Sequence, residues 1–215
     1  MLSNFFKSSA KNPNSTRVLD SEYGVYGKIP SVGDFFSRGL PRQDIVAVDH
    51  WLQEGMVALQ ALRDDWQATY LIAPVWRFLI PAGVLGSSAK SGLVMASVDK
   101  IGRYFPIVVL ASHEQIDDRL LLKIGPALHS LSVLLPRVIY ERLAPDLLFA
   151  EIVSLLGELS ESTGSNEAYY NIHPTKQRSY WWAVNQQGLK TSIQHAGALN
   201  AELFKKLFGV RCEFL

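Results

Sequence analysis

The sequence predicts an α/β fold, a helix–sheet–helix three-layer sandwich around a mixed, largely antiparallel central sheet. Two observations predict this fold class. Residues 76–80 and 107–110 are apolar at nearly every position, which is typical of strands buried on both faces. Segments whose apolar residues recur three and four positions apart stand before and after these strands, so helices can cover both faces of the sheet.

The fold begins with a strand and a long helix. Residues 22–27 alternate aromatic and small side chains, as a strand does, and Pro30, Gly33 and residues 39–41 mark an ordered loop after it. From Asp44 onward, an apolar stripe at helical spacing predicts one long helix that continues to Trp66, and Pro74 ends the helical region. The residues of the stripe are Ile45, Val48, Leu52, Met56, Leu59, Leu62 and Trp66.

Three short strands follow, at residues 75–80, 92–98 and 104–111. They are rich in β-branched or aromatic residues and are bounded by glycine, proline or aspartate. Closely spaced strands of this kind favour a meander.

The second half of the chain predicts helices and a hairpin. Asp117 or Asp118 caps a helical region, and the prolines at 126 and 136 predict a kink or two consecutive helices. Pro145 opens another helix, which ends in the Ser/Thr/Gly-rich residues 160–165. Residues 180–184 and 189–193 flank a turn, which predicts a hairpin, and Asn200 caps a last short helix.

Length and composition predict one domain. A chain of 215 residues hides about 70% of the surface that its unfolded form exposes, so it builds a core without disulfides. Residues 1–20 are rich in serine, asparagine and lysine and lack periodic apolar positions, so we expect a flexible N-terminal extension before a single domain at residues 21–215.

Charge and hydropathy exclude several classes of function. The 21 basic and 20 acidic side chains nearly balance, which gives no electrostatic footprint for nucleic acid. No apolar run approaches the roughly 20 residues of a membrane helix, so we expect no membrane insertion. A single cysteine, Cys212, and the lack of a signal-peptide pattern indicate a cytoplasmic protein.

None of the common catalytic or metal-binding patterns is present. The GVYGK segment at residues 24–28 has two residues between its glycines, whereas a phosphate loop has four. His113 is not followed by a second histidine four positions later, as a zinc-protease helix requires, and the other histidines are scattered singly. Cys212 has no neighbouring histidine in the sequence. We therefore expect no enzymatic activity, no cofactor and no metal.

Two polar loops, residues 28–38 and 99–104, are the candidate sites. Binding residues concentrate on loops held by a rigid scaffold. A structural explanation is also available, because aspartate caps turns, glycine permits a positive φ and arginine pairs locally with aspartate. The candidate partner-binding residues are Lys28, Asp34, Arg38, Asp99, Arg103 and Tyr104.

At these loops the chain resembles the TagF/ImpM family of type VI secretion-associated accessory proteins. The segments that carry the resemblance are YGKIPSVGDF at residues 26–35, RGLP at 38–41, DHWL at 49–52, PVWRF at 74–78 and SVDKIGRYFP at 97–106. They keep the order of the family pattern over about residues 23–112. The second half of the chain is assigned by continuity, and the tryptophans at 181 and 182 resemble a late element of the family.

The resemblance implies a helix–sheet–helix fold and a cytoplasmic protein that restrains assembly or firing of the secretion machine after translation. It implies a cytoplasmic type VI secretion component as partner, such as a forkhead-associated scaffold protein. On this hypothesis the charged loop residues determine specificity. The alternative is a small-ligand-binding protein or an enzyme, in which Lys28, Asp34, Asp99 and Arg103 converge on one cleft.

Overall fold

A seven-stranded sheet forms the centre of the computed structural model, which describes residues 23–159, 177–185, 188 and 190–209. The strands lie in the order β2-β1-β5-β4-β3-β6-β7, and every neighbouring pair is antiparallel. Their bounds are β1 Gly24–Gly27, β2 Phe36–Arg38, β3 Trp76–Ile80, β4 Ala89–Met95, β5 Ile107–His113, β6 Arg178–Val184 and β7 Lys190–Ala196. Strands β3, β4 and β5 form the predicted meander, and β6 and β7 pair as the predicted hairpin.

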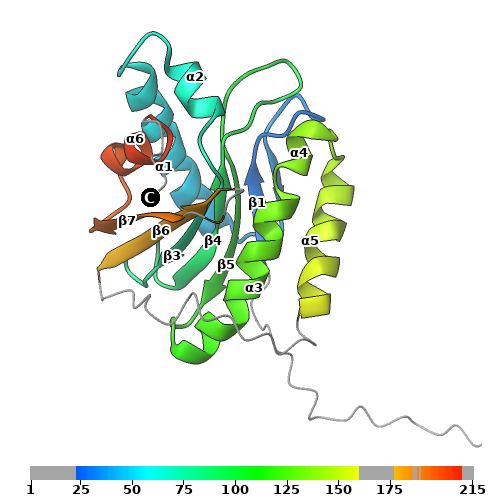
Figure 1. The fold of residues 1–215 in the computed structure, drawn as a ribbon, viewed down its shortest axis with the longest axis vertical. Helices are drawn as coiled ribbons and strands as arrows, with labels where there is room; N and C mark the ends of the chain where they lie inside the picture. The colour runs from blue at the N-terminus through cyan, green and yellow to red at the C-terminus, as the bar shows by residue number, and fades with distance from the viewer. Residues whose placement is uncertain (1–22, 160–176, 186–187, 189, 210–215) are drawn as a thin grey trace, which may run out of the picture.

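Helices cover both faces of the sheet, as Figure 1 shows. One face carries α1 (Arg42–Gln60), α2 (Trp66–Leu71) and α6 (Ala201–Phe208). The other carries α3 (Asp118–Leu134), α4 (Arg137–Tyr140) and α5 (Pro145–Leu159). The predicted α/β three-layer sandwich is confirmed.

Alternation along the central strands divides the interior into two cores. On β3, Leu79 packs toward α3 and its neighbour Phe78 packs toward α1 and α6. On β4, Leu93 and Val94 divide in the same way. Successive side chains of a strand point to opposite faces, so a strand covered on both sides is apolar at every position. This confirms the interpretation of the continuous apolar runs.

Capping residues begin the helices where the sequence predicts. The side chain of Asp117 accepts a hydrogen bond of 2.8 Å from the backbone N–H of Leu120, and Asn200 caps α6 through a 3.0 Å bond from the N–H of Leu203. Pro145 occupies the first position of α5. The side-chain caps of Asp117 and Asn200 each contribute about 1 kcal/mol, because each satisfies a backbone donor that the helix itself leaves unpaired.

The predicted long helix is wrong beyond Gln60. The chain leaves α1 there and forms a turn before α2 begins at Trp66. Leu62, which belongs to the predicted stripe, is 48% exposed, and Arg63 pairs with Asp65 inside the turn. The apolar pattern continues across the break because the turn returns Trp66 to the core that α1 covers.

The strand predictions need three corrections. β4 begins at Ala89 and β5 ends at His113, so both include polar residues that the apolar pattern does not mark. These polar residues have buried partners: Lys90 Nζ lies 2.6 Å from Asp44 Oδ1. Residues 96–106 leave the sheet as a loop, in which Val98 and Tyr104 form an isolated bridge. The short strand β2 lies inside the segment that the sequence predicts as a loop.

The two prolines of the α3 region act differently. Helix α3 runs through Pro126, whereas Pro136 separates α3 from α4. The prediction of two consecutive helices is therefore confirmed at the second proline.

Some predictions lie outside the described residues, namely the N-terminal extension, the loop at residues 160–165 and Cys212. No helix in the described part of the chain has both the length and the apolar character to span a membrane. Among the same residues, no three His, Cys, Asp or Glu side chains are grouped so that they could hold a metal ion.

Candidate functional site

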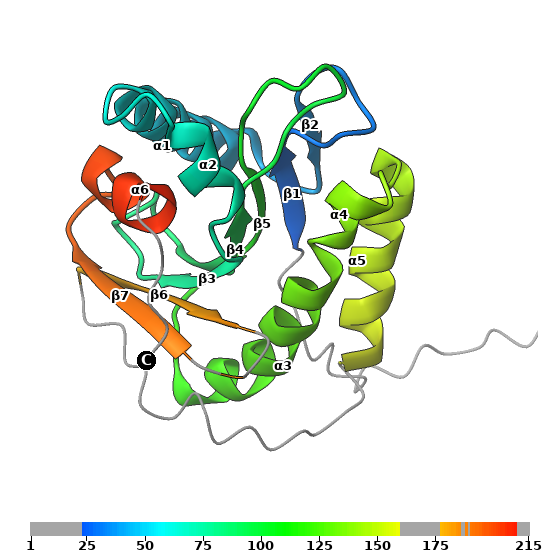
Figure 2. The ribbon, with the colours of Figure 1, turned by 45° about the horizontal axis from the view of Figure 1, so that its top comes forward.

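The two candidate loops lie side by side at one end of the sheet (Figure 2). One joins β1 to β2 and the other joins β4 to β5. The backbone N–H of Lys100 donates to the carbonyl of Val32 at 2.8 Å, and Ser97 Oγ donates to the carbonyl of Lys28 at 2.7 Å. The loops therefore form one surface, although about 70 residues separate them in the sequence.

Gly27 allows the loops to approach. Its φ is +138°, and a Cβ atom at this position would lie 2.1 Å from the carbonyl oxygen of Pro106. Only glycine fits such a contact, because every other residue carries a Cβ. The glycine that resembles part of a phosphate loop thus serves the packing of β1 against β5.

Asp99 is the centre of the loop surface. Its Oδ2 lies 3.0 Å from Lys28 Nζ and 2.6 Å from Arg103 Nε. Its Oδ1 accepts hydrogen bonds from the backbone N–H groups of Ile101, at 3.0 Å, and Arg103, at 2.9 Å. Arg103 also donates to the carbonyl of Gly33 through Nη2, which joins the second loop to the first.

The carboxylate of Asp99 is held in its charged form. Burial works toward a higher pKa, but hydrogen bonds from the backbone of Arg103 and the side chains of Lys28 and Arg103 outweigh burial, and the pKa of Asp99 lies well below its usual range. The side chains of both Lys28 and Asp99 are buried. A buried ion pair with satisfied hydrogen bonds holds its loops in one arrangement.

Aromatic rings support the same surface. The ring of Phe35 is stacked on that of Tyr26, at 5.8 Å between centroids, and meets the edge of Phe105 at 4.9 Å. Lys28 Nζ lies 5.0 Å from the centroid of Phe35. Tyr26 and Phe105 are buried, whereas Phe35 is 45% exposed. Phe35 is thus held in place from beneath and presents part of its ring to solvent.

The structure brings three of the six predicted site residues into contact, namely Lys28, Asp99 and Arg103. Asp34 is exposed, and its side chain accepts a 2.7 Å hydrogen bond from the backbone N–H of the next residue, Phe35. Arg38 pairs with Asp146 of α5 at 2.5 Å.

Tyr104 lies apart from the ion pairs and packs its ring against two aromatic rings of α2. The edge of Trp66 is 5.1 Å away between centroids, and that of Tyr70 is 5.9 Å away. Its contacts therefore belong to the core beneath the loop.

Exposed apolar residues are the part of this surface that sequence reasoning missed. Ile101 is 71% exposed at the tip of its loop, and Phe35 is exposed on the neighbouring loop. Gly102 occupies a turn and has a φ of +84°. A large apolar residue directly beside such a turn glycine is the sequence signal that could have found Ile101. The charged residues Lys28 and Asp99 attract notice in the sequence, yet the structure buries them.

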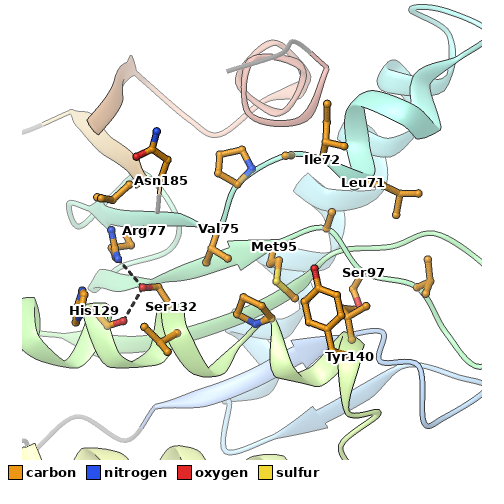
Figure 3. Close-up of a pocket in the computed structure, with 18 residues that line it drawn as sticks. Leu71, Ile72, Val75, Arg77, Met95, Ser97, His129, Ser132, Tyr140 and Asn185 are labelled. Carbon is orange, nitrogen blue, oxygen red and sulfur yellow. Dashed lines mark hydrogen bonds between the residues drawn. The ribbon is translucent and has the colours of Figure 1, made fainter. Parts of the chain in front are cut away.

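A pocket of about 840 Å³ lies next to this surface, between the α2–β3 connection, the end of β4 and helices α3 and α4 (Figure 3). Ser97 and Val98 are part of its wall and lead directly into the Asp99 loop. Lys28, Asp34, Asp99 and Arg103 do not line it. These four residues therefore do not converge on this pocket.

Comparisons with known proteins give a family and a related structure. The family described as TagF N-terminal domain, type VI secretion system-associated, matches residues 24–154, more than half of the chain. The crystal structure of PA0076 from Pseudomonas aeruginosa PAO1 is similar, with a TM-score of 0.61 and 25% sequence identity over 90% of this chain and 97% of that one. No curated protein matches significantly.

Proposed function

Because the chain belongs to the TagF N-terminal domain family of type VI secretion system-associated proteins, we propose that it is a non-enzymatic regulator of this system that acts by binding one of its components. The observation that carries this proposal is the surface built around Asp99. There, a buried ion pair joins two loops and leaves an aromatic and an aliphatic side chain exposed.

The chemistry of this surface suits protein binding. Aromatic residues and arginine dominate the energetics of protein interfaces, and anchors that are already held in place lose little entropy on binding. Phe35 is stacked on Tyr26, and the side chain of Arg103 is half exposed while its Nε is bound to Asp99. A partner would meet the exposed ring of Phe35 on one loop and the exposed side chain of Ile101 on the other, with charged groups on the same loops.

The proposed partner is a cytoplasmic component of the secretion machine, such as a forkhead-associated scaffold protein, and the proposed effect is repression after translation. The resemblance of the loop motifs to the TagF/ImpM family supports both. On this proposal the protein works in the cytoplasm, and the charged residues Asp34 and Arg103 contribute to the choice of partner.

The alternative of a small-ligand site in the loops receives less support from the geometry. Both oxygens of Asp99 are bound by groups of the protein, and Lys28 Nζ lies between Asp99 and the ring of Phe35. A ligand would have to displace these contacts, which hold the loops together.

Affinity purification from the native bacterium tests the proposal. Ile101→Glu and Asp34→Ala change exposed side chains, so we expect both variants to fold and to recover at least tenfold less of the type VI component that the wild-type protein retains. Val57→Glu is the matched control, because Val57 is 68% exposed on α1, outside the loop surface. Equal recovery by the loop variants and the control would exclude this surface as the binding site.

A secretion assay tests the direction of the effect. If the protein is a repressor, a strain that carries only the Ile101→Glu variant secretes more than the wild type, as a deletion strain does. Unchanged secretion in the deletion strain would remove the regulatory role, and lost secretion would favour a structural role.

A further inference from the structure

The pocket between α3, α4 and the α2–β3 connection has two chemically different ends. Figure 3 shows Arg77, His129, Ser132 and Asn185 at one end, and Leu71, Ile72 and Tyr140 toward the other. Between the ends, Val75 and Met95 belong to the apolar lining.

The polar end favours an anionic group. Arg77 lies on β3, is 5% exposed and donates to Ser132 Oγ at 2.6 Å and to the carbonyl of Leu128 at 3.4 Å. None of the described lining residues is acidic, whereas Arg77 carries a positive charge. An arginine in a mostly apolar wall attracts a carboxylate strongly, because water screens the pair poorly there.

The rim of the pocket indicates how large the bound molecule is. Four large apolar side chains stand exposed along it: Ile72 and Val133 are each 63% exposed, Tyr140 is 85% exposed and Leu71 is 53% exposed. A small molecule inside the pocket would leave these side chains in water. A peptide that lies across the pocket would cover them, and clusters of exposed apolar residues mark such interaction sites.

We propose that this pocket is a second docking site, which binds an apolar peptide segment of a partner protein with its Asp or Glu side chain at the Arg77 end. The apolar side chains of the segment pack on Val75, Met95 and the rim, and its carboxylate lies near Arg77 and Ser132. The inference goes beyond the loop surface, since it depends only on residues of the pocket.

Selection from a phage-displayed library of random 12-residue peptides on the immobilised full chain tests this site. We expect enriched peptides that combine several large apolar residues with Asp or Glu. Their affinity is measured by fluorescence anisotropy. It should fall at least tenfold for Val133→Glu, which adds a carboxylate at the rim to the one that the peptide brings. It should fall about tenfold for Tyr140→Ala. Replacing the acidic residue of the peptide by its amide should weaken binding severalfold.

Two controls separate this site from the loop surface and from loss of folding. Val57→Glu makes the same change at an equally exposed position on the opposite face of the sheet, and it should bind the peptides as the wild type does. Ile101→Glu should also bind them normally, whatever its effect on the secretion component. Circular dichroism confirms that each variant is folded.

Four results would overturn the proposal. The first is that no enriched peptide distinguishes the wild type from Val133→Glu, and the second is that the amide peptide binds as well as the acid. Saturable binding of dansyl-undecanoic acid without any peptide binding would assign the pocket to a small amphiphile. Self-association in analytical ultracentrifugation that Val133→Glu abolishes would assign it to a second copy of this chain.

Discussion

Asp99→Asn is the sharpest test of how the loop surface is held together. Asparagine has nearly the shape of aspartate and keeps an oxygen for the N–H groups of Ile101 and Arg103. Its NH2 group replaces the oxygen that accepts from Lys28 and Arg103, so the substitution removes the charge and turns that acceptor into a donor. It leaves the ammonium of Lys28 buried without its carboxylate. Breaking one side of a buried ion pair costs about 3–5 kcal/mol, and we expect the free energy of unfolding to fall by that amount.

Urea denaturation followed by circular dichroism measures this loss. The free energy of unfolding of a domain is about 5–15 kcal/mol, so the loss is a large share of the total, and the melting temperature should fall by roughly 10 °C. Arg63→Ala, which breaks the exposed pair with Asp65, is the control and should change the free energy of unfolding by less than about 1 kcal/mol.

A double variant distinguishes the charge of Lys28 from general damage. Lys28→Met with Asp99→Asn removes both charges, and Arg103 can turn its half-exposed side chain to solvent. The double variant should recover most of the lost stability, because replacing both partners of a buried pair is often nearly neutral. If Asp99→Asn alone stays within about 1 kcal/mol of the wild type, the ion pair does not hold the loops.

Two further predictions concern backbone packing and pH. Gly27→Ala forces a Cβ against the carbonyl of Pro106 and should lower the free energy of unfolding by more than about 3 kcal/mol. Gly102→Ala, at positive φ but in open space, should lower it by about 1 kcal/mol. Thermal melts in which the two variants are equally stable would contradict this reasoning. Burial, followed by the charge of Lys90, lowers the pKa of His113 from 6.5 to about 4, so the unfolded chain binds the proton more tightly. Stability should therefore fall by about 3 kcal/mol as the pH drops from 6.5 to 4, and His113→Gln should remove this part of the pH dependence in urea titrations.

Several elements of the fold follow from local signals in the sequence. The continuous apolar runs of β3 and β5 indicate burial on both faces, and Asp117 and Asn200 mark helix starts, because these patterns depend on neighbouring residues alone. The break after Gln60 escapes such analysis, since the apolar spacing continues across it and tertiary packing decides where the helix ends.

The candidate site is predictable to a lesser degree. The sequence picks out Lys28, Asp99 and Arg103 as charged loop residues but cannot show that Asp99 binds both cations. It also does not show which of them reach solvent. Exposure depends on how two distant loops pack, so the roles of Phe35 and Ile101 become visible only in the structure.

The three-layer fold class and the family follow from the amino-acid sequence, because local periodicity and ordered motifs carry both. Only the folded chain shows that Lys28 and Asp99 form a buried pair inside one loop surface, with Phe35 and Ile101 outside. The same holds for the pocket that residues from β3, β4, α3 and α4 surround, with Arg77 at one end. Both features join segments far apart in the chain, and only the packing of helices on the two faces of the sheet brings such segments together.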